Sequence, residues 1–201
     1  MLKLIAGTLC LISCFAITVA QERPRLSSPA VVKVEFEYKL LATNRVSTME
    51  QEMREAASAG YRFTEVISGA TFWGGGEALV VMVRPRDGDH KARFDYKLLA
   101  TSKTSTMQKE LQEAGDAGYE HRGQSVFQKR IGTEVIVILE RELDVKPKLW
   151  DYKLLATKKT STMQKELMEA AEAGYQFVGF STGPTLFGGN EVVTIMRRPR
   201  E

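Results

Sequence analysis

Paired glutamates are the residues whose type and spacing could do acid–base or metal chemistry. Three pairs stand three residues apart: Glu52/Glu55, Glu110/Glu113 and Glu166/Glu169. Two carboxylates on one helical face can exchange protons or hold a metal ion, and in helical bundles such metal sites also recruit a histidine. The segments around these pairs have no histidine and carry basic residues among the glutamates. Because a solvated helix face of mixed charge explains that pattern better, we expect no catalytic or metal site.

Histidine and cysteine are scarce in this chain. His90 falls in a predicted linker and His121 in a predicted strand, while Cys10 and Cys14 both lie within the first twenty residues. With so few histidines and cysteines, we expect no zinc site, and beyond residue 20 there is no cysteine to act as a thiol nucleophile. No Gly-x-Ser-x-Gly motif supports a serine nucleophile. We therefore expect a protein without a cofactor that is not an enzyme, and an unrecognised hydrolase is the least favoured function class.

Large apolar side chains beside consecutive glycines mark two predicted hairpins. They are Phe72 and Trp73 within Gly69–Gly76, and Leu186 and Phe187 within Gly183–Asn190. Exposed aromatic side chains on adaptable loops are favoured contacts for a protein partner, because they bury much area at little entropic cost. The same residues could instead fold back onto a neighbouring repeat. The equivalent segment 127–132 lacks the feature, so partner binding is expected of the first and third hairpins only.

Basic residues precede each predicted helix, namely Arg45, Lys103 and Lys159. Together with the free backbone N–H groups of a helix start, they could hold a small anion such as a phosphate or a sugar acid. The alternative is a capped helix with solvated basic side chains beside it, because capping already occupies some of those N–H groups. Binding of small anionic or saccharide ligands is accordingly the second functional hypothesis.

The elements that must position these residues belong to one repeated unit. Residues 95–119 return at 151–175 with differences at only four positions, and residues 37–61 are a looser copy. The copies stand 58 and then 56 residues apart. Self-similarity at such a period indicates one small module used three times.

The pattern within each copy predicts a strand, a helix and two further strands. The first strand, Phe36–Ala42 in the first copy, places every second side chain on one face. The second strand begins near Tyr61. The third strand is apolar on both sides, as in Ala78–Val83 and Val135–Leu139. A strand of that kind is usually central in its sheet and covered on both faces.

The predicted helix has a start, an apolar stripe and an end. The pattern Ser-x-x-Glu/Gln predicts a capping box, formed by Ser47 and Glu50, by Ser105 and Gln108, and by Ser161 and Gln164. Spacing of i, i+4, i+7, i+8 gives one apolar stripe, with Met49, Met53, Ala56 and Ala57 in the first copy and Met163, Leu167, Ala170 and Ala171 in the third. Glycine then ends each helix, at Gly60, Gly118 and Gly174.

The predicted fold class is α+β, with three tandem βαββ modules at 34–86, 94–142 and 149–201 that pack against each other. A crossover followed by a hairpin predicts the strand order 1-3-2 in each small antiparallel sheet. The helix covers one face of this sheet, and a neighbouring module is the expected cover of the other. The unpaired edge of the first strand could also join sheets from different modules.

The opening Tyr-Lys-Leu-Leu, the helix ending in Ala-Gly-Tyr and the apolar third strand ending in Arg resemble the small bacterial modules of the domain-of-unknown-function 4177 family. Those modules typically read Tyr-Lys-Val-Val early and Gly-Trp-Glu-Leu after the helix. Here Tyr61, Tyr119 and Tyr175 stand at the tryptophan position. The resemblance extends over each copy. It implies a βαββ fold and a tendency to associate, and it carries over no catalytic residues.

Residues 1–20 are typical of a secretory signal peptide. A short basic start is followed by the apolar run Leu4–Val19 and by small residues before an expected cleavage after Ala20. The run is shorter than the roughly 20 residues of a membrane span. A lipid anchor on Cys14 is a minor alternative, because its surroundings resemble a lipobox. We expect a secreted or periplasmic protein with a flexible spacer at 21–33 and no membrane span after cleavage.

The charge balance bears on the kind of partner. Removing Lys3 with the signal peptide leaves 27 of the 28 basic side chains against 25 acidic ones. Nucleic-acid binding needs a concentrated basic surface, so no nucleic-acid partner is expected. By elimination, the first functional hypothesis is an exported, non-enzymatic interaction or scaffolding module of the bacterial envelope. Its partner would be another envelope or extracellular protein, or a second copy of itself.

Overall fold

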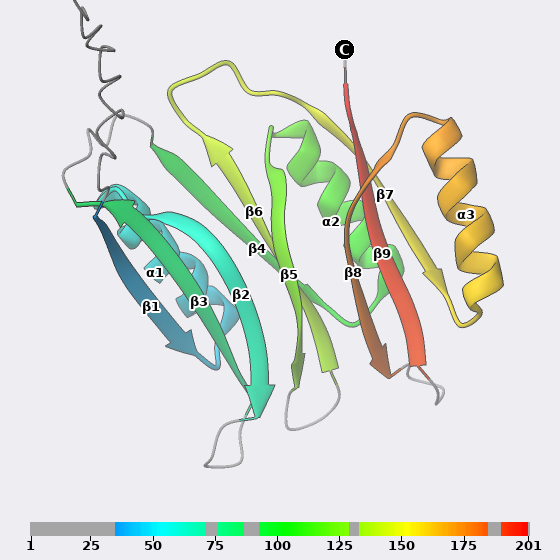
Figure 1. The fold of residues 1–201 in the computed structure, drawn as a ribbon, viewed down its shortest axis with the longest axis horizontal. Coiled ribbons are helices and arrows are strands. Elements are labelled where there is room, and N and C mark those ends of the chain that lie inside the picture. The colour runs from blue at the N-terminus through cyan, green and yellow to red at the C-terminus, as the bar shows by residue number, and fades with distance from the viewer. Residues whose placement is uncertain (1–34, 71–75, 87–92, 129–132, 185–189, 201) are drawn as a thin grey trace, which may run out of the picture. The chain divides into compact units, whose positions relative to one another are not determined.

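Each sequence copy folds as a strand, a helix and two further strands, which confirms the α+β class and the three tandem βαββ modules (Figure 1). The computed structural model describes residues 35–70, 76–86, 93–128, 133–184 and 190–200. Module 1 comprises β1 (Phe36–Thr43), α1 (Val46–Ser58), β2 (Arg62–Ala70) and β3 (Gly76–Pro85). Module 2 comprises β4 (Phe94–Thr101), α2 (Thr104–Asp116), β5 (Glu120–Gln128) and β6 (Thr133–Glu142). Module 3 comprises β7 (Trp150–Thr157), α3 (Thr160–Glu172), β8 (Gln176–Pro184) and β9 (Asn190–Pro199).

Each module forms one antiparallel sheet of three strands with the predicted order, β1-β3-β2 in module 1. The first strand pairs with the third along its whole length, from Phe36 opposite Pro85 to Thr43 opposite Ala78. The edge of the first strand, which could have joined sheets from different modules, does not do so in the part of the chain that the structure describes, where the three sheets stay separate. The physical reason is that helix side chains bond the outer edges of β4 and β7.

Helix α1 has the predicted apolar stripe, and all three helices end as predicted. The four residues of the α1 stripe are buried. Gly60, Gly118 and Gly174 have φ angles of 85°, 82° and 84°, a left-handed region that strains any residue with a side chain. In module 1 the N–H of Tyr61 donates to the carbonyl oxygen of Ala56 at 3.1 Å. This hydrogen bond across the glycine closes the helix as in a Schellman motif.

The predicted capping boxes are wrong. The N-cap residues are Arg45, Lys103 and Lys159, and none of the three helices has a side-chain cap hydrogen bond. Ser47 lies inside α1, at its second position. The amide of Arg45 instead donates to Thr43 Oγ1 at 3.2 Å. The short pattern Ser-x-x-Glu/Gln predicts a local contact, but the glutamate of α1 and the glutamine of α2 find partners in the next module.

Side-chain alternation gives each sheet an inner face on its own helix and an outer face turned away from it. Leu41 of β1 packs in one apolar cluster with Met53 of α1, and the outer-face residues Tyr96 and Leu98 of β4 belong to that same cluster. A second cluster contains residues of α2 and of the inner face of its own sheet, together with outer-face residues of module 3 such as Tyr152. The predicted cover of a sheet by its neighbouring module is thus confirmed for modules 2 and 3.

The helix α3 packs on its own sheet alone within the described residues. The third apolar cluster holds only module 3 residues, Leu155, Met163, Ala170 and Met196. Of the stripe predicted for α3, Met163 and Ala170 are buried and Leu167 is half-buried, but Ala171 is exposed. That last prediction is wrong because the equivalent positions of α1 and α2 are covered by the following module, not by their own sheet.

Candidate functional site

The modules meet at two joints that are built alike. At the first joint α1 packs on β4 and β2 packs on β5, and at the second joint α2 packs on β7 and β5 packs on β8. Each joint therefore sets the helix and second strand of one module against the first strand and outer face of the next. Equivalent positions at the two joints and at the two ends of the array can be compared directly.

Two glutamines of α2 bond the edge of β7 as a further strand would. The Gln108 side chain donates to the carbonyl oxygen of Tyr152 at 2.9 Å and accepts from the N–H of Leu154 at 2.7 Å. The Gln112 side chain donates to the carbonyl oxygen of Trp150 at 3.2 Å and accepts from the N–H of Tyr152 at 3.1 Å. Edge groups that would invite another strand are thereby satisfied.

At the first joint, charged residues of α1 form the equivalent hydrogen bonds to the edge of β4. Glu50 accepts from the N–H of Leu98 at 2.8 Å. Arg54 donates to the carbonyl oxygen of Tyr96 at 3.0 Å and pairs with Asp95 at 2.9 Å. The residue that the sequence suggested as a capping partner in α1 therefore connects two modules.

A tyrosine of each following module reaches into a bulge of the preceding one. The pairing of β2 with β3 shifts register between Phe63 and Glu65, and the N–H of Phe63 donates to the hydroxyl of Tyr96 at 2.8 Å. That hydroxyl in turn donates to the buried Glu140 carboxylate at 2.7 Å. Burial, followed by the nearby carboxylate of Glu140, raises the pKa of Tyr96, so this hydroxyl keeps its proton.

The second joint repeats the tyrosine contact. The N–H of His121 donates to the hydroxyl of Tyr152 at 2.7 Å, and that hydroxyl donates to the carbonyl oxygen of Tyr119 at 3.0 Å. Burial raises the pKa of Tyr152 to about 12. His121 is buried, and burial lowers its pKa to about 4.

The two joints carry ion pairs of opposite polarity at one pair of positions. At the first joint Arg62 of β2 pairs with Glu140 of β6 at 2.8 Å. At the second joint Glu120 of β5 pairs with Arg197 of β9 at 2.6 Å. The basic residue thus comes from the preceding module at one joint and from the following module at the other.

Glycines allow the modules to approach closely. A Cβ atom at Gly115 would overlap the carbonyl oxygen of Trp150, a backbone atom with little freedom to move. A Cβ at Gly123 would lie 2.9 Å from the ring of Phe63, and a Cβ at Gly179 would lie 2.7 Å from the Gln124 amide. Real Cβ contacts are longer than this. The carbonyl oxygen beside Gly115 and the ring beside Gly123 leave little room for a side chain, whereas the Gln124 amide beside Gly179 ends a flexible side chain that can move aside.

The outer face of the first sheet is uncovered among the described residues. We call it the head surface, and its large apolar members are Phe36, Tyr38, Leu40 and Ile67. Tyr38 is 67% exposed and Leu40 is 63% exposed, whereas their counterparts Tyr96 and Leu98 are 0% and 8% exposed. The same side chains are therefore core residues in module 2 and surface residues in module 1.

The outer side of α3 and β8 is uncovered in the same way. We call it the tail surface, and its large apolar members are Met168, Phe177 and Phe180. Phe177 is 52% exposed and Phe180 is 63% exposed, with ring centroids 6.1 Å apart. Their counterparts in module 1, Phe63 and Val66, are buried against module 2.

The contact residues suggested by the sequence belong to segments that the structure does not describe. Phe72, Trp73, Leu186 and Phe187 lie outside the described residues, in the segments 71–75 and 185–189 that connect the second and third strands of modules 1 and 3. Sequence reasoning missed the head and tail surfaces, because alternation assigns a residue to a face without telling whether a neighbour covers that face. A signal lay in the copies themselves: the Gln112 position is Met168 in α3, and an apolar residue there is unusual for a solvated helix face.

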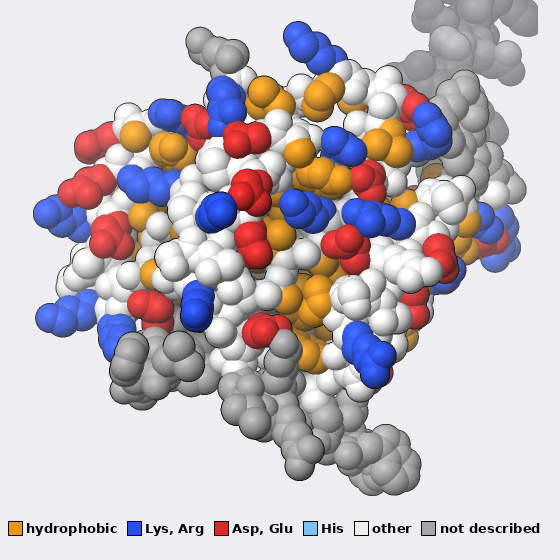
Figure 2. All heavy atoms as spheres, turned by 180° about the vertical axis from the view of Figure 1, so that it is seen from behind, with side chains coloured by type: hydrophobic (Ala, Val, Ile, Leu, Met, Phe, Trp, Pro, Cys, Tyr) orange, Lys and Arg blue, Asp and Glu red, His pale blue; other side chains and the backbone are white. Residues whose placement is uncertain are grey.

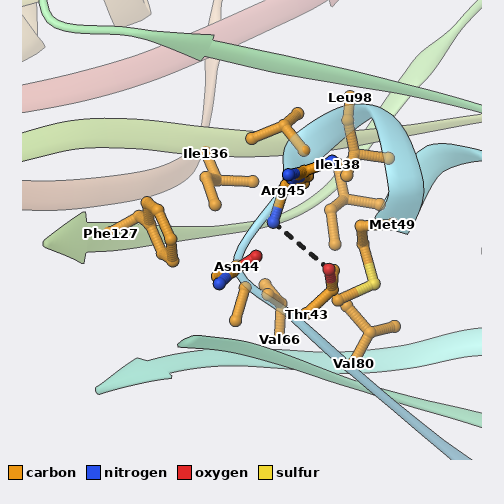
Figure 3. A pocket seen from close by; sticks show the side chains of 12 residues that line it. Thr43, Asn44, Arg45, Met49, Val66, Val80, Leu98, Phe127, Ile136 and Ile138 are labelled. Atoms are coloured by element: carbon orange, nitrogen blue, oxygen red, sulfur yellow. Dashed lines mark hydrogen bonds between the residues drawn. The ribbon is translucent and has the colours of Figure 1, made fainter. Parts of the chain in front are cut away.

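The basic residues Arg45, Lys103 and Lys159 are exposed, each at the start of its own helix. Figure 3 shows a small gap at the start of α1, where the N–H of Arg45 donates a hydrogen bond to Thr43. This gap measures about 10 Å³ and is lined mostly by apolar side chains, among them Met49, Phe127 and Ile138. Such a gap has room for about one water molecule, so it is not a ligand pocket.

A wider groove also has Arg45 in its lining. Its lining includes Arg45 and Lys97 but neither of the other two predicted anion-binding residues. The acidic side chains of the lining, Glu50, Glu110, Glu113 and Glu134, outnumber the two basic ones. Like charges repel an anion in such a groove, so its chemistry does not favour an anionic ligand.

Charge and metal chemistry add no further site in the part of the chain that the structure describes. On the face seen in Figure 2, basic and acidic side chains lie interspersed, with hydrophobic side chains between them. Across the described ranges, no group of three or more His, Cys, Asp or Glu residues could hold a metal ion. None of the described helices has the length and apolar character needed to cross a membrane.

Comparison of the chain with models of known protein families, with curated proteins and with solved structures finds no match. The resemblance to the domain-of-unknown-function 4177 modules therefore stays a prediction. Among the described residues, the head and tail surfaces are each the uncovered half of a joint that the molecule builds twice internally.

Proposed function

We propose that this protein is an exported, non-enzymatic protein–protein interaction or scaffolding module of the bacterial envelope. One observation carries the proposal: positions that are buried at both joints are exposed at the head and tail surfaces. Tyr38 illustrates the first surface, because Tyr96 and Tyr152 are both buried, and Phe177 illustrates the second, because Phe63 and His121 are both buried. Contiguous apolar side chains of this kind on a folded surface usually mark a contact site for another molecule.

The backbone of β1 supports the same proposal. The equivalent strands β4 and β7 each have an edge that a preceding helix bonds through its side chains. The edge of β1 has the same sequence pattern, Tyr-Lys-Leu-Leu. An exposed edge strand with apolar side chains is a template for recognition by main-chain hydrogen bonds and side-chain pockets. A protein partner supplies both, whereas a small ligand covers only a fraction of such a surface.

The hairpins with Phe72, Trp73, Leu186 and Phe187 remain part of this proposal as additional contact residues. Binding of a small anion or saccharide at Arg45, Lys103 and Lys159 stays a prediction, and no contact or cavity described above favours it over protein binding. Secretion or residence in the periplasm likewise rests on the signal-peptide pattern in residues 1–20.

The test is affinity capture from native envelope extract with the chain that begins at Gln21, after the predicted cleavage. Wild type is compared with Leu40→Glu on the head surface and Phe180→Glu on the tail surface. Lys109→Glu, at a side chain of α2 that is 79% exposed and belongs to neither surface, is the matched control. We expect at least one polypeptide, another protein or the same chain, to be retained by wild type and control and lost by one of the surface variants.

An identical bound set for all four proteins would contradict the proposal. Because Leu40 and Phe180 are both mostly exposed, each variant should keep the wild-type melting temperature in dilute solution, and this measurement shows that any loss of binding is local.

A further inference from the structure

We infer that the head surface of one copy binds the tail surface of a second copy, in the arrangement that joins module 1 to module 2 and module 2 to module 3. This inference rests on the proposed function and names its partner. It follows from continuity: the molecule already builds this interface twice, and its two ends carry the two unused halves.

The hydrogen-bonding groups of a third joint are in place. Gln164 of α3 is exposed and stands at the position of Gln108, which bonds the backbone of Tyr152 and Leu154. The equivalent groups of β1 are the carbonyl oxygen of Tyr38 and the N–H of Leu40. The same glutamine contact can therefore form between α3 of one copy and β1 of another.

The tyrosine contact can form as well. β8 has the same register shift as β2 and β5, between Phe177 and Gly179. The amide of Phe177 corresponds to those of Phe63 and His121, which donate to the tyrosine hydroxyl of the following module. Tyr38, with its exposed hydroxyl-bearing side chain, is the residue that would accept this hydrogen bond.

An ion pair of the second joint also has its counterpart at the ends. Asp116 at the end of α2 pairs with Arg200 after β9 at 2.7 Å, and Asp151 holds the same guanidinium at 2.7 Å. The equivalent of Asp116 is the exposed Glu172, and the equivalent of Arg200 is Arg86. Arg86 is already oriented by Glu35 at 3.0 Å and Glu37 at 3.6 Å, as Arg200 is by Asp151.

Several residues of the two end surfaces differ from their counterparts at the internal joints and set the strength of the contact. Glu65 of β2 stands where Gly123 and Gly179 let the preceding module approach. Gln176 and Val83 stand at the two positions that form an ion pair at each internal joint, and both are uncharged. The contact between copies is thus weaker than the internal joints and depends on protein concentration. It is also heterologous, so repeated binding gives an open chain of copies unless the rotation closes a ring.

The test measures molar mass against concentration by light scattering and sedimentation velocity. Wild type is expected to grow beyond the dimer as its concentration rises. Leu40→Glu blocks the head and Phe180→Glu blocks the tail, so each variant alone should stay a monomer. Mixed in equal amounts, they should form a dimer that grows no further, because the intact tail of one meets the intact head of the other. Lys109→Glu should behave as wild type.

The substitution Glu65→Gly tests the arrangement itself. Removing the side chain that crowds the tail surface should lower the midpoint concentration of association about tenfold, the gain expected from relieving one overpacked position. A wild-type chain that stays monomeric at every concentration, a Phe180→Glu variant that dimerises alone, or a mixture without dimer would overturn the inference. The proposed function would survive any of these outcomes if the capture experiment still identified a different protein that depends on Leu40 or Phe180.

Discussion

The hydroxyl of Tyr96 lies 2.8 Å from the backbone nitrogen of Phe63, a residue of the preceding module, and accepts its hydrogen. The amide belongs to a β-bulge, where the register of β2 against β3 shifts. A bulge leaves a backbone group outside the ladder of its own sheet. In this protein the next module satisfies that group, so an irregularity within one sheet becomes an attachment point for another.

Tyr96→Phe is expected to lower the free energy of unfolding by about 1–3 kcal/mol, because the buried amide of Phe63 and the Glu140 carboxylate each lose a partner. Denaturant unfolding measures the change. The matched control is Tyr38→Phe, at the equivalent but exposed position, which should be neutral in dilute solution. Equal effects of the two substitutions would show that the contact with Phe63 contributes nothing to stability.

Gln108→Ala is expected to cost about 1–3 kcal/mol of unfolding free energy, since it leaves the carbonyl oxygen of Tyr152 and the N–H of Leu154 unpaired at a closed joint. Gln164→Ala removes the same side chain from the same helix position in module 3, where it is exposed. Measured below the concentration at which copies associate, this second variant should unfold with wild-type stability. A neutral Gln108→Ala would contradict the role assigned to the glutamine.

Gly115→Ala should have two opposing effects on the stability of the folded protein. Helix propensity alone predicts a gain of about 1 kcal/mol for alanine over glycine. The added Cβ would overlap the carbonyl oxygen of Trp150, and overpacking of this kind costs about 1–3 kcal/mol. We expect the overlap to dominate and the melting temperature to fall. Ala171→Gly in α3, at the exposed equivalent position, should report propensity alone, so a stabilised Gly115→Ala would show that β7 does not pack closely on α2.

His121 makes stability depend on pH. Burial lowers its pKa to about 4, against 6.5 for an unperturbed histidine. The unfolded chain therefore takes up a proton below pH 6.5 that the folded chain takes up only near pH 4, so stability is complete above pH 6.5 and falls between these values. Between pH 7.5 and 5.5 the loss from this group should be about 1 kcal/mol.

The control for this pH dependence is His121→Phe, which installs the residue found at the equivalent positions 63 and 177. The guanidinium groups of Arg122 and Arg197 also lower the pKa of this histidine, but they do not titrate in this range. The difference in unfolding free energy between pH 7.5 and 5.5 should shrink by about 1 kcal/mol in the variant. The same pH response in both proteins would mean that another group causes it.

Much of the fold was predictable because it depends on local chemistry. Gly60, Gly118 and Gly174 end the helices since only a left-handed residue fits there, and the apolar third strands had to be central. The roles of Glu50 and Gln108 were not predictable in this way. Their local pattern matches a capping box, and only the packing of the next module shows that the backbone of β4 and β7 competes successfully for these side chains.

The solvent exposure of a side chain also could not be predicted from local sequence patterns. The repeated Tyr-Lys-Leu-Leu segment has the same periodicity in all three modules, yet its tyrosine is exposed at position 38 and buried at positions 96 and 152. The difference arises from neighbours that are distant in sequence. Comparing the copies does carry information, because Glu65 stands where both internal joints have a glycine, Gly123 and Gly179.

The reversed ion pairs, Arg62 with Glu140 and Glu120 with Arg197, distinguish module 2 from module 3 as neighbours of a preceding module. Nearly identical tandem copies risk exchanging neighbours while the chain folds. If module 3 took the place of module 2, Arg62 would face Arg197, and two guanidinium groups would meet where each correct joint has an attractive pair. Because the sign of this pair is reversed between the joints, modules 2 and 3 are not interchangeable, although residues 95–119 and 151–175 are nearly identical.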